Sequence, residues 1–508
     1  MILSVLAVSL ALFREPPRAY APHVWWHWMN GNVTREGISA DLEAMAGIGL
    51  GGAQFFDAGC SVPRGPLAFN TPEWFDTVKH AVREAKRLGL ELGQSNCSAW
   101  SSSGGPWITP ENSMKRLVFT ETNATAGVSG LRLPQPETQL GFYRDVRVLA
   151  FPAGKPPAPI AARETARSKY SITLETDEPR EIEGFSYRIG LKWEWCAWSR
   201  MTVEASADGR TFEKVEEFPF VITEAGRFDR SLRYHALPRK RRVKAMRFTM
   251  TAPWQESPHL AEVRFESIPR VAEVAAKTFE IRNTLFRTHI PEGLSVGGAV
   301  ARDSIVDLTD RMSADGTLDW TVPAGEWTVL RIGATTTGSK TCSASETGSG
   351  LECDKLSAKG IDAHFDAYLK PLLEGLGPLA GKDRTFTNLL IDSFEVGAGN
   401  WTWGLDEAFE RRFDYSLVPY LVAWTGRAVG SLAETEKALA DFRRLVSDLF
   451  VENFVDECAR KARAAGLRYA MEPYGNMSAD ATHYAAHADL PMTEFWVTAD
   501  DGVPEQVE

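Results

Sequence analysis

The chain has 508 residues, of which 44% are hydrophobic and 24% charged, and its formal net charge at pH 7 is -11. This length predicts two or three domains, each large enough to bury a core. The acidic balance argues against a nucleic-acid partner, because phosphate contacts require a basic surface. Beyond the N-terminal segment, no apolar run is long enough to predict a membrane span.

Residues 1–20 form an N-terminal segment with a strongly apolar start, Met1–Phe13. This run is too short to cross a bilayer, but it resembles the core of a secretory signal with Ser9–Ala11 as a cleavage site. It lacks the basic residues that normally precede such a core, so a non-signal apolar segment or a mistaken start site is the alternative. We expect a signal segment, and therefore a secreted or periplasmic protein.

Residues 21–116 alternate strand and helix patterns at the spacing of parallel βα units. Thr71 is a good N-cap before Pro72 at the first helical position, and Gly89 ends the same helix. The expected strands cover 24–28, 49–56 and 90–94, and the expected helices cover 35–45 and 72–87. We predict that this segment is the first part of a β/α barrel.

Residues 117–340 change to short alternating strands with almost no helical periodicity. The stretch Ser206–Phe212 resembles the S-x-D-G-x-x-F hairpin of galactose-binding-like jelly rolls, and Trp320–Trp327 resembles an edge strand of the same fold. We predict one or two β-sandwich modules inserted into the barrel.

Residues 341–508 return to the βα pattern. The expected helices cover 361–374, 405–413 and 434–465, and the expected strands cover 386–393, 467–471 and 490–494. Three strands precede the insertion and three follow it, whereas a closed barrel needs eight. We therefore predict a (β/α)8 TIM-type barrel that is incomplete at the C-terminus, and we expect the chain to be a truncated piece of a longer protein.

Acidic residues stand at the ends of the last three predicted strands. Asp392 and Glu395 follow the first of these strands, Glu472 ends the second and Glu494 ends the third, while Glu352 lies in a Gly-rich loop. Apolar strands with acidic carboxyl ends are typical of a β/α barrel active site. Several such ends together indicate acid/base chemistry by paired carboxylates, and the aromatic residues beside them indicate a sugar substrate.

An ordered series of short stretches resembles glycoside hydrolase family 106, the α-L-rhamnosidase-like family. The matching stretches are 25–34, 41–45, 104–111, 333–338, 350–355, 392–395 with 400–402, and 472–475 with 494–496. Each stretch alone is modest, but their order along nearly the whole chain is specific. The resemblance implies a catalytic (β/α)8 domain with β-sandwich insertions, and hydrolysis of terminal α-L-rhamnose with inversion.

An inverting hydrolase needs one protonated acid at the glycosidic oxygen and one carboxylate that activates water on the opposite face. We predict Glu395 as the acid, because its aromatic neighbours would desolvate it and raise its pKa. We predict Glu494 as the base, because the ends of strands two apart face each other across part of a barrel mouth. Glu472 is the main alternative for either role and Glu352 the second, and a structural or sugar-orienting role is the alternative for all four.

Polar and aromatic residues near the strand ends are the predicted substrate contacts. They are Trp26, Trp28, Asp57, Asn96, Trp107, Glu352, Asp392, Trp401, Tyr474 and Trp496. For the tryptophans of the first strand, a position in the core fits the sequence about as well. Calcium would suit the oxygen ligands of this region, but its expectation rests on the family resemblance, its ligands are unassigned, and no organic cofactor is indicated.

Two other functions stay open. One is a barrel glycosidase for another sugar, and the other is a non-catalytic carbohydrate-binding protein whose barrel is degenerate. The intact acidic strand ends argue against degeneracy. The six cysteines have no zinc-site spacing, and Cys342 with Cys353 is one conceivable disulfide pair.

Overall fold

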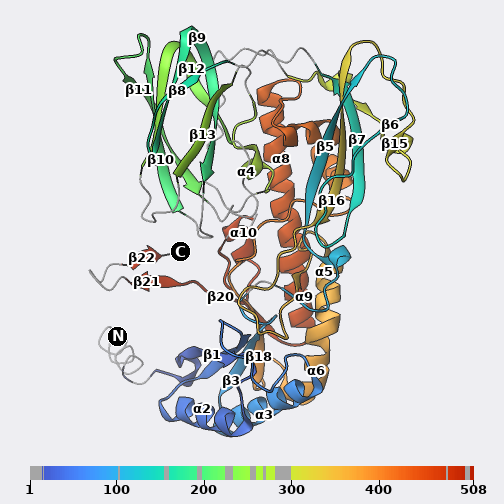
Figure 1. The fold of residues 1–508 in the computed structure, drawn as a ribbon. Coiled ribbons are helices and arrows are strands. Elements are labelled where there is room, and N and C mark those ends of the chain that lie inside the picture. Colours follow the sequence, from blue (N-terminus) through green and yellow to red (C-terminus); the bar gives the residue numbers. More distant parts are fainter. Residues whose placement is uncertain are drawn as a thin grey trace, which may run out of the picture. The chain divides into compact units, whose positions relative to one another are not determined.

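The computed structural model describes residues 14, 16–100, 103–153, 160–190, 197–222, 233–251, 259–266, 270–280, 299–475, 479–497 and 504–507 (Figure 1). It divides into two units. The α/β unit comprises Met1–Met114, Thr336–Val396 and Ser447–Glu508, and the β-rich unit comprises Lys115–Thr335 and Gly397–Val446. Residues 397–446, which the sequence analysis placed in the barrel, thus pack with the β-rich unit. Most of the expected signal segment, residues 1–13 and 15, lies outside the described residues.

A six-stranded parallel sheet forms the centre of the α/β unit. Its strand order is β1-β2-β3-β18-β19-β20, so the three strands before the insertion and the three after it join in one sheet, as predicted. The strands are β1 (His23–Met29), β2 (Gly52–Ala58), β3 (Glu91–Ser95), β18 (Phe386–Ile391), β19 (Arg468–Met471) and β20 (Leu490–Pro491).

The predicted TIM-type barrel, expected to be incomplete at its C-terminus, is not confirmed, because the sheet of the described residues is open. The sheet has six strands, and β1 and β20 do not pair with each other. The last strand is also shorter than expected: β20 ends at Pro491, and one more backbone bond follows, from the Met492 N–H to the Met471 carbonyl at 2.8 Å. As a result Glu494 does not end a strand but lies between β20 and β21 (Phe495–Val497).

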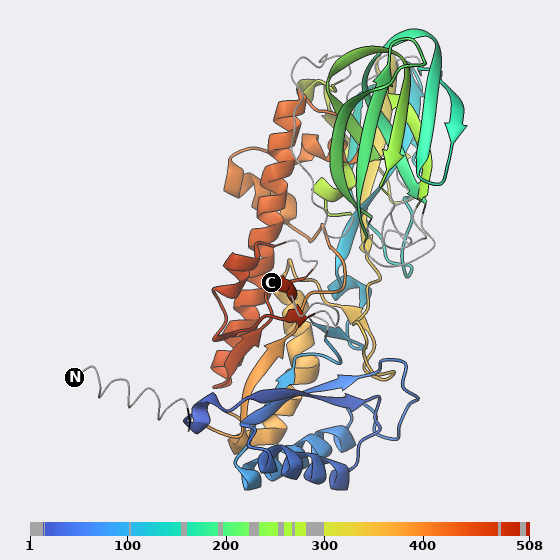
Figure 2. The same cartoon turned by 90° about the vertical axis from the view of Figure 1, so that its left-hand side faces the viewer.

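Helices α2 (Arg35–Gly47) and α3 (Pro72–Leu88) cover one face of β1, β2 and β3 (Figures 1 and 2). Helix α3 has the predicted ends: the Thr71 hydroxyl accepts the Trp74 N–H at 3.3 Å, and Gly89 closes the helix with φ +70°. Trp74 is fully buried on the sheet-facing side of this helix. The cap residues and the apolar stripe therefore fix where the helix begins, where it ends and which face it buries.

Two of the predicted long helices contain a π-helical turn. The helix expected at 361–374 consists of α5 (Ala358–His364), a π turn at Phe365–Leu369 and α6 (Lys370–Leu376). The helix expected at 434–465 consists of α8 (Leu432–Phe450), a π turn at Val451–Val455 and α9 (Asp456–Ala464). Helix α10 (Ala481–Ala485) lies between β19 and β20 in the chain. None of the helices in the described ranges has the length and apolar content of a bilayer span.

The larger sheet of the β-rich unit is antiparallel and folds back on itself. Its strands are β8 (Arg163–Arg167), β9 (Ser171–Gly190), β10 (Ala197–Ser206), β11 (Glu213–Ile222), β12 (Arg233–Met250) and β13 (His259–Glu266). Phe248 pairs with Ile172, and Phe185 pairs with His235 much further along the same two strands, yet the Phe185 and Phe248 rings are 4.6 Å apart. The two halves of the sheet therefore face each other across one core, and Figure 2 shows the resulting strong curvature.

A hairpin joins β10 and β11 at Ser206–Phe212, the stretch in which the sequence predicted one. The Asp208 carboxylate accepts N–H bonds from Arg210 and Thr211 and a hydroxyl bond from Ser206. These bonds, that of Thr211 first, lower the pKa of Asp208 to about 2. The turn is thus held by one side chain, as in an Asx turn.

A second antiparallel sheet of the β-rich unit has the order β14-β7-β16-β5. Its strands are β5 (Lys115–Thr125), β7 (Arg144–Pro152), β14 (Val306–Asp307) and β16 (Glu326–Thr336). Trp320 and Trp327, from the predicted edge strand, meet edge to face at 5.5 Å beside the core of this sheet. Helix α7 (Leu405–Phe413) belongs to the same unit.

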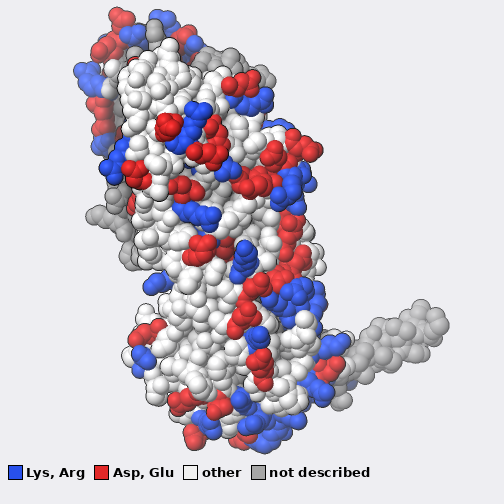
Figure 3. Space-filling view, turned by 90° about the vertical axis from the view of Figure 1, so that its right-hand side faces the viewer, with Lys and Arg blue, Asp and Glu red and all other residues white. Residues whose placement is uncertain are grey.

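Cys342 and Cys353 are not joined by a disulfide, so the conceivable pair is not formed. The described surface also carries both charge signs. On the face shown in Figure 3, Lys and Arg side chains alternate with Asp and Glu side chains rather than forming a broad basic patch. This distribution agrees with the net charge of -11.

Candidate active site

Two carboxyl groups meet at the carboxyl ends of the central strands. Leu390 pairs with Ala470 and Ile391 with Met471, and the Glu472 N–H donates to the Ile391 carbonyl at 2.9 Å. The next residues in register are therefore Asp392 and Glu472, whose side chains share a hydrogen bond. Asp392 is 6% exposed and Glu472 2% exposed. Both side chains project to the same side of the sheet because residues alternate along a strand.

The Asp392 carboxyl group holds a proton at neutral pH. Burial is the main cause, and the hydrogen bond and negative charge of Glu472 add to it, so the pKa of Asp392 rises to about 9. The Ser393 N–H, 2.7 Å from Oδ1, and the Ser393 hydroxyl at 3.2 Å act in the opposite direction. One proton shared by two adjacent carboxyl groups is an arrangement found in acid/base catalysts.

Tyr474 contacts the buried pair. Its hydroxyl donates to Glu472 Oε2 at 2.8 Å, and the Glu494 carboxylate acts on the phenol electrostatically. Burial and the two nearby carboxylates raise the pKa of Tyr474. The loop is fixed to the neighbouring strand end, since the Phe394 N–H donates to the Tyr474 carbonyl at 3.0 Å.

Gly475 makes that close approach of the two loops feasible. Its φ is +111°, a conformation that favours glycine, and a Cβ at this position would lie 2.5 Å from the Phe394 carbonyl oxygen. The loops after β18 and β19 are therefore locked together at the position where their acidic side chains meet.

Glu395 and Glu494 are the two partly exposed members of the predicted carboxylate set. Glu395 Oε1 accepts the Ser393 hydroxyl at 2.8 Å, and the same hydroxyl lies 3.2 Å from Asp392. Ser393 thus links a buried carboxyl group to a solvent-accessible one. The sequence analysis did not single out Ser393, although its place between two acidic residues was a signal for such a link.

Glu352 is fully buried in an ion pair. Its Oε2 lies 2.6 Å from Lys355 Nζ, and Lys355 also donates to the carbonyls of Ser103 and Cys353. Glu352 ends β17 (Leu351–Glu352), which pairs with β4 (Gly104–Gly105). These contacts match the structural alternative, in which Lys355 neutralises the carboxylate.

Asp57 and Asn96 are buried and bonded to neighbouring loops. Asp57 Oδ1 accepts the Ser98 hydroxyl at 3.0 Å, and the Ser98 hydroxyl lies 3.2 Å from that of Ser345. Burial outweighs these bonds and raises the pKa of Asp57 to about 6. Asn96 Nδ2 donates to the Ser103 hydroxyl at 2.8 Å. Both side chains hold loops at the carboxyl ends of the strands.

Trp107 is held in place by His364, a residue that the sequence analysis missed. The indole N–H donates to His364 Nδ1 at 3.2 Å, and His364 Nε2 donates to the Asn96 carbonyl at 2.6 Å. Tyr368 stacks on the indole with ring centres 5.5 Å apart. Trp107 remains partly exposed, so it is compatible with the predicted sugar contact.

Trp26 and Trp28 point toward the helices rather than toward the carboxyl cluster. Trp28 is 1% exposed and stacks on Phe55 at 5.0 Å, and the Trp26 indole N–H donates to Asp41 of α2 at 2.9 Å. Of the two faces that strand alternation allowed, these residues occupy the core face. Their packing gives them a structural role.

Trp401 and Trp496 are the remaining predicted substrate contacts. Trp401 is buried in the β-rich unit, where Asn400 and Trp401 donate backbone bonds to the Lys115 carbonyl. The Trp496 side chain lies outside the described part of the chain, although its backbone belongs to β21.

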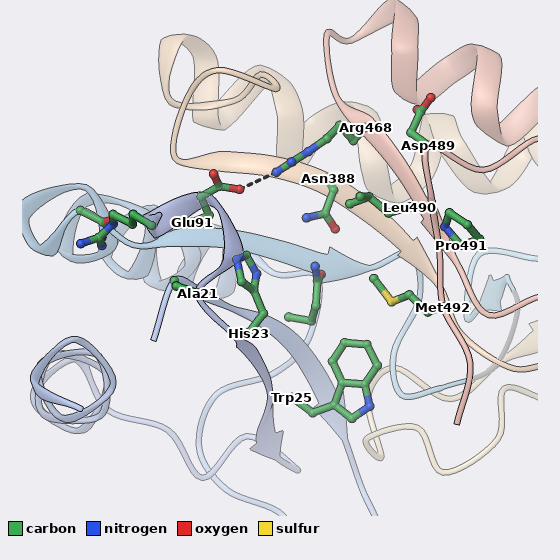
Figure 4. Close-up of a pocket in the computed structure, with 14 residues that line it drawn as sticks. Ala21, His23, Trp25, Glu91, Asn388, Arg468, Asp489, Leu490, Pro491 and Met492 are labelled. Atoms are coloured by element: carbon green, nitrogen blue, oxygen red, sulfur yellow. Dashed lines mark hydrogen bonds and ion pairs between the residues drawn. The ribbon is translucent and has the colours of Figure 1, made fainter. Parts of the chain in front are cut away.

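A pocket of about 960 Å³ lies near the opposite, amino ends of the same strands (Figure 4). His23, Glu91 and Arg468, each the first residue of its strand, line it, and Glu91 forms an ion pair with Arg468. None of the predicted site residues lines this pocket. In barrel-type sheets this end is associated with stability rather than catalysis.

Within the described residues, no group of three or more His, Cys, Asp or Glu side chains has the arrangement of a metal site. His483 and His487 lie 5.5 Å apart as rings, but His487 pairs with Asp456. The calcium expectation stays a prediction.

Comparison with known proteins adds to this geometry. The family model described as alpha-L-rhamnosidase, glycoside hydrolase family 106, matches residues 14–508. The chain belongs to glycoside hydrolase family 106. The family resemblance inferred from the ordered motifs is thereby confirmed.

Two known proteins are similar to this chain over nearly its whole length. The solved structure of a rhamnosidase from Novosphingobium sp. PP1Y superimposes with a TM-score of 0.79 at 29% identity, over 98% of this chain and 50% of that chain. A Formosa agariphila protein, provisionally named a beta-glucuronidase, is 33% identical over 489 residues, which are 95% of this chain and 32% of that protein. The chain thus spans half of one relative and about a third of the other.

Proposed function

We propose that this family 106 chain carries the catalytic carboxylates of a glycosidase. In the proposal the enzyme releases terminal α-L-rhamnose from glycosides or polysaccharides with inversion. The single observation that carries the proposal is the cluster of acidic groups at the carboxyl ends of β18 and β19, with Glu494 beside it. The match to the rhamnosidase family model and to a solved rhamnosidase supports the choice of sugar.

The exposure of the carboxyl groups supports a division of roles. A group that transfers a proton to the substrate or to water must be able to reach it. Glu395 and Glu494 are partly exposed, whereas Asp392 and Glu472 are buried behind them. In the proposal Glu395 protonates the leaving oxygen, Glu494 activates water, and the buried pair sets the protonation of the site.

The open sheet supports a further proposal about the complete protein. Within the described residues both edge strands, β1 and β20, lack a second neighbour, and the chain spans half of the rhamnosidase chain that it resembles. In the proposal, additional strands in a longer protein complete a (β/α)8 barrel, and secretion would bring the enzyme to rhamnose-containing polysaccharides.

A β-glucuronide is the second candidate substrate, favoured by the 33% identity with the protein provisionally named a beta-glucuronidase. A glucuronate carries a carboxylate that rhamnose lacks, so the two sugars need different contacts. A site for glucuronate would require a cationic side chain close to the acidic cluster.

The experiment is hydrolysis of 4-nitrophenyl α-L-rhamnopyranoside and 4-nitrophenyl β-D-glucuronide by the full-length protein, with and without a chelator. Proton NMR of the first product formed reports whether the anomeric configuration inverts. Preferential release from the rhamnoside with inversion is expected. Turnover of the glucuronide alone would transfer the proposal to that sugar. Binding of rhamnosides by a folded protein without turnover would support the binding-only alternative, and loss of turnover on chelation would support calcium.

A further inference from the structure

Ser393 follows β18 and contacts an acidic residue on each side of it in the chain. Its hydroxyl donates to Glu395 Oε1 at 2.8 Å and lies 3.2 Å from Asp392 Oδ1. The Ser393 backbone N–H also donates to Asp392 Oδ1, at 2.7 Å. A hydroxyl has one proton to donate, and this Asp392 oxygen already accepts a short bond from the N–H. The shorter contact, to Glu395, is therefore the main bond of the hydroxyl.

The Ser393 hydroxyl has a well-defined position, because the backbone is anchored on both sides of this residue. The Glu472 N–H donates to the Ile391 carbonyl at 2.9 Å, and the Phe394 N–H donates to the Tyr474 carbonyl at 3.0 Å. The Phe394 side chain is buried, and Ser393 itself is only 4% exposed. These contacts leave the serine little room to follow the movements of a side chain that it bonds.

Glu395 differs from Ser393 in both respects. It is partly exposed, and its long side chain has several rotamers, so that holding it in one orientation costs conformational entropy. In the described part of the chain, the Ser393 hydroxyl is the hydrogen-bond partner of its carboxyl group. One fixed donor thus sets the orientation of a side chain that is otherwise free to turn toward solvent.

We infer that Ser393 is a positioning residue for the general acid: its hydroxyl fixes Oε1 of Glu395, so that Oε2 is the oxygen that faces the leaving group and delivers the proton. The chemical part of this inference rests on the proposed function, in which Glu395 is the acid. The orientation of the carboxyl group does not, because it follows from the hydrogen bond to Ser393.

The bond to Oε1 suits the chemistry of proton transfer. In a carboxylic acid one oxygen carries the proton and the other accepts hydrogen bonds, so a donor at Oε1 favours the acid proton on Oε2. When this proton passes to the glycosidic oxygen, the bond from that oxygen to the sugar breaks, its electron pair stays on the leaving group, and Glu395 becomes a carboxylate. A hydrogen bond to a carboxylate is roughly twice as strong as one between neutral groups. Ser393 therefore stabilises the transition state more than the ground state.

The kinetic test compares two aryl rhamnosides as substrates of the full-length protein. Phenyl α-L-rhamnopyranoside has a poor leaving group that needs the proton, whereas the 2,4-dinitrophenyl glycoside has a leaving group that departs without it. Ser393→Ala should lower kcat on the phenyl substrate about 10-fold or more, because the acid is no longer held in place. On the dinitrophenyl substrate kcat should change less than about 2-fold, and KM should stay similar for both.

Two further variants separate positioning from a general defect. Ser393→Thr keeps a hydroxyl at the same atom and should regain most of the lost kcat. Ser39→Ala is the matched control, since it removes a serine hydroxyl that lies 3.1 Å from His80 Nε2 between α2 and α3, and it should behave as wild type. An equal loss of kcat on both substrates in Ser393→Ala would indicate a structural defect and would contradict the inference.

A second measurement does not depend on turnover. Crystal structures of the full-length wild type and its Ser393→Ala variant show where the Glu395 carboxyl group lies in each. We expect Glu395 to change rotamer or to lose order in the variant, while Asp392 and Glu472 keep their places. A Glu395 carboxyl group that stays ordered in its wild-type position would overturn the inference. If the wild-type protein hydrolyses no rhamnoside, the proposed function fails, while the two crystal structures still decide whether Ser393 orients Glu395.

Discussion

Asp392 and Glu472 form a carboxyl–carboxyl hydrogen bond at the ends of two neighbouring parallel strands. The sequence separates them by 80 positions, but the strand register places them side by side. Because both are buried, one of the two must keep a proton at neutral pH. The Ser393 hydroxyl links the Asp392 member to the partly exposed Glu395, and the Tyr474 hydroxyl donates to the Glu472 member at 2.8 Å.

The buried proton predicts a pH dependence of stability. The pKa of Asp392 is raised from 3.8 to about 9, so the folded state binds this proton more tightly than the unfolded state does. Its stabilising contribution is complete below the unfolded pKa and is lost as the pH rises through the folded pKa. Asp392→Asn cannot titrate, so its melting temperature should depend less on pH than that of wild type between about 4 and 9. Parallel curves for the two proteins would contradict the raised pKa.

The Glu352–Lys355 ion pair predicts a strong asymmetry between single and double variants. Lys355→Met leaves a buried carboxylate without its cation, and loss of one partner of a buried pair costs about 3–5 kcal/mol. Lys355→Met combined with Glu352→Gln should regain much of this loss, because the charge is removed as well. Thermal unfolding measures both effects. If the double variant were as unstable as the Lys355 single variant, the pair would not explain the burial of Glu352.

His364 predicts a loss of stability in mild acid. Burial lowers its pKa from 6.5 to about 4, and its neutral Nδ1 accepts the Trp107 N–H. For a lowered pKa, the stabilising contribution is present above the unfolded value and is lost as the pH falls through the folded value. His364→Gln, which can accept from Trp107 and donate to Asn96, should flatten the fall in melting temperature between pH 6.5 and about 4. His483→Gln at an exposed position of α10 is the control and should leave the fall unchanged.

The sequence predicted the α/β unit well where a single residue type determines the local backbone structure. Thr71 with Pro72 and Gly89 set both ends of α3, and the six predicted strands join in one parallel sheet. The prediction failed where the position of a side chain depends on the residues that pack against it. Strand alternation allowed Trp28 on either face, and only packing against Phe55 and Trp74 selects the core face.

The candidate site shows the same limit. All four acidic strand-end residues and Glu352 were visible in the sequence, but their pairing was not. The Asp392–Glu472 contact depends on the register of two distant strands, and the Glu352–Lys355 contact depends on how a short hairpin is buried. Glu494 was expected at a strand end, yet β20 ends at Pro491. The barrel was expected from six βα-type strands, and closure needs strands that the described residues do not supply.

The most direct test of the account is the turnover of 4-nitrophenyl α-L-rhamnopyranoside by the full-length protein beside its Glu395→Gln and Glu494→Gln variants. Both variants should fold and should lose roughly 10²–10⁴-fold in kcat, because each lacks one proton-transfer group. Glu374→Gln, an exposed position on α6, should keep wild-type turnover. Near-normal turnover in both Glu395→Gln and Glu494→Gln would contradict the assignment of these two carboxylates.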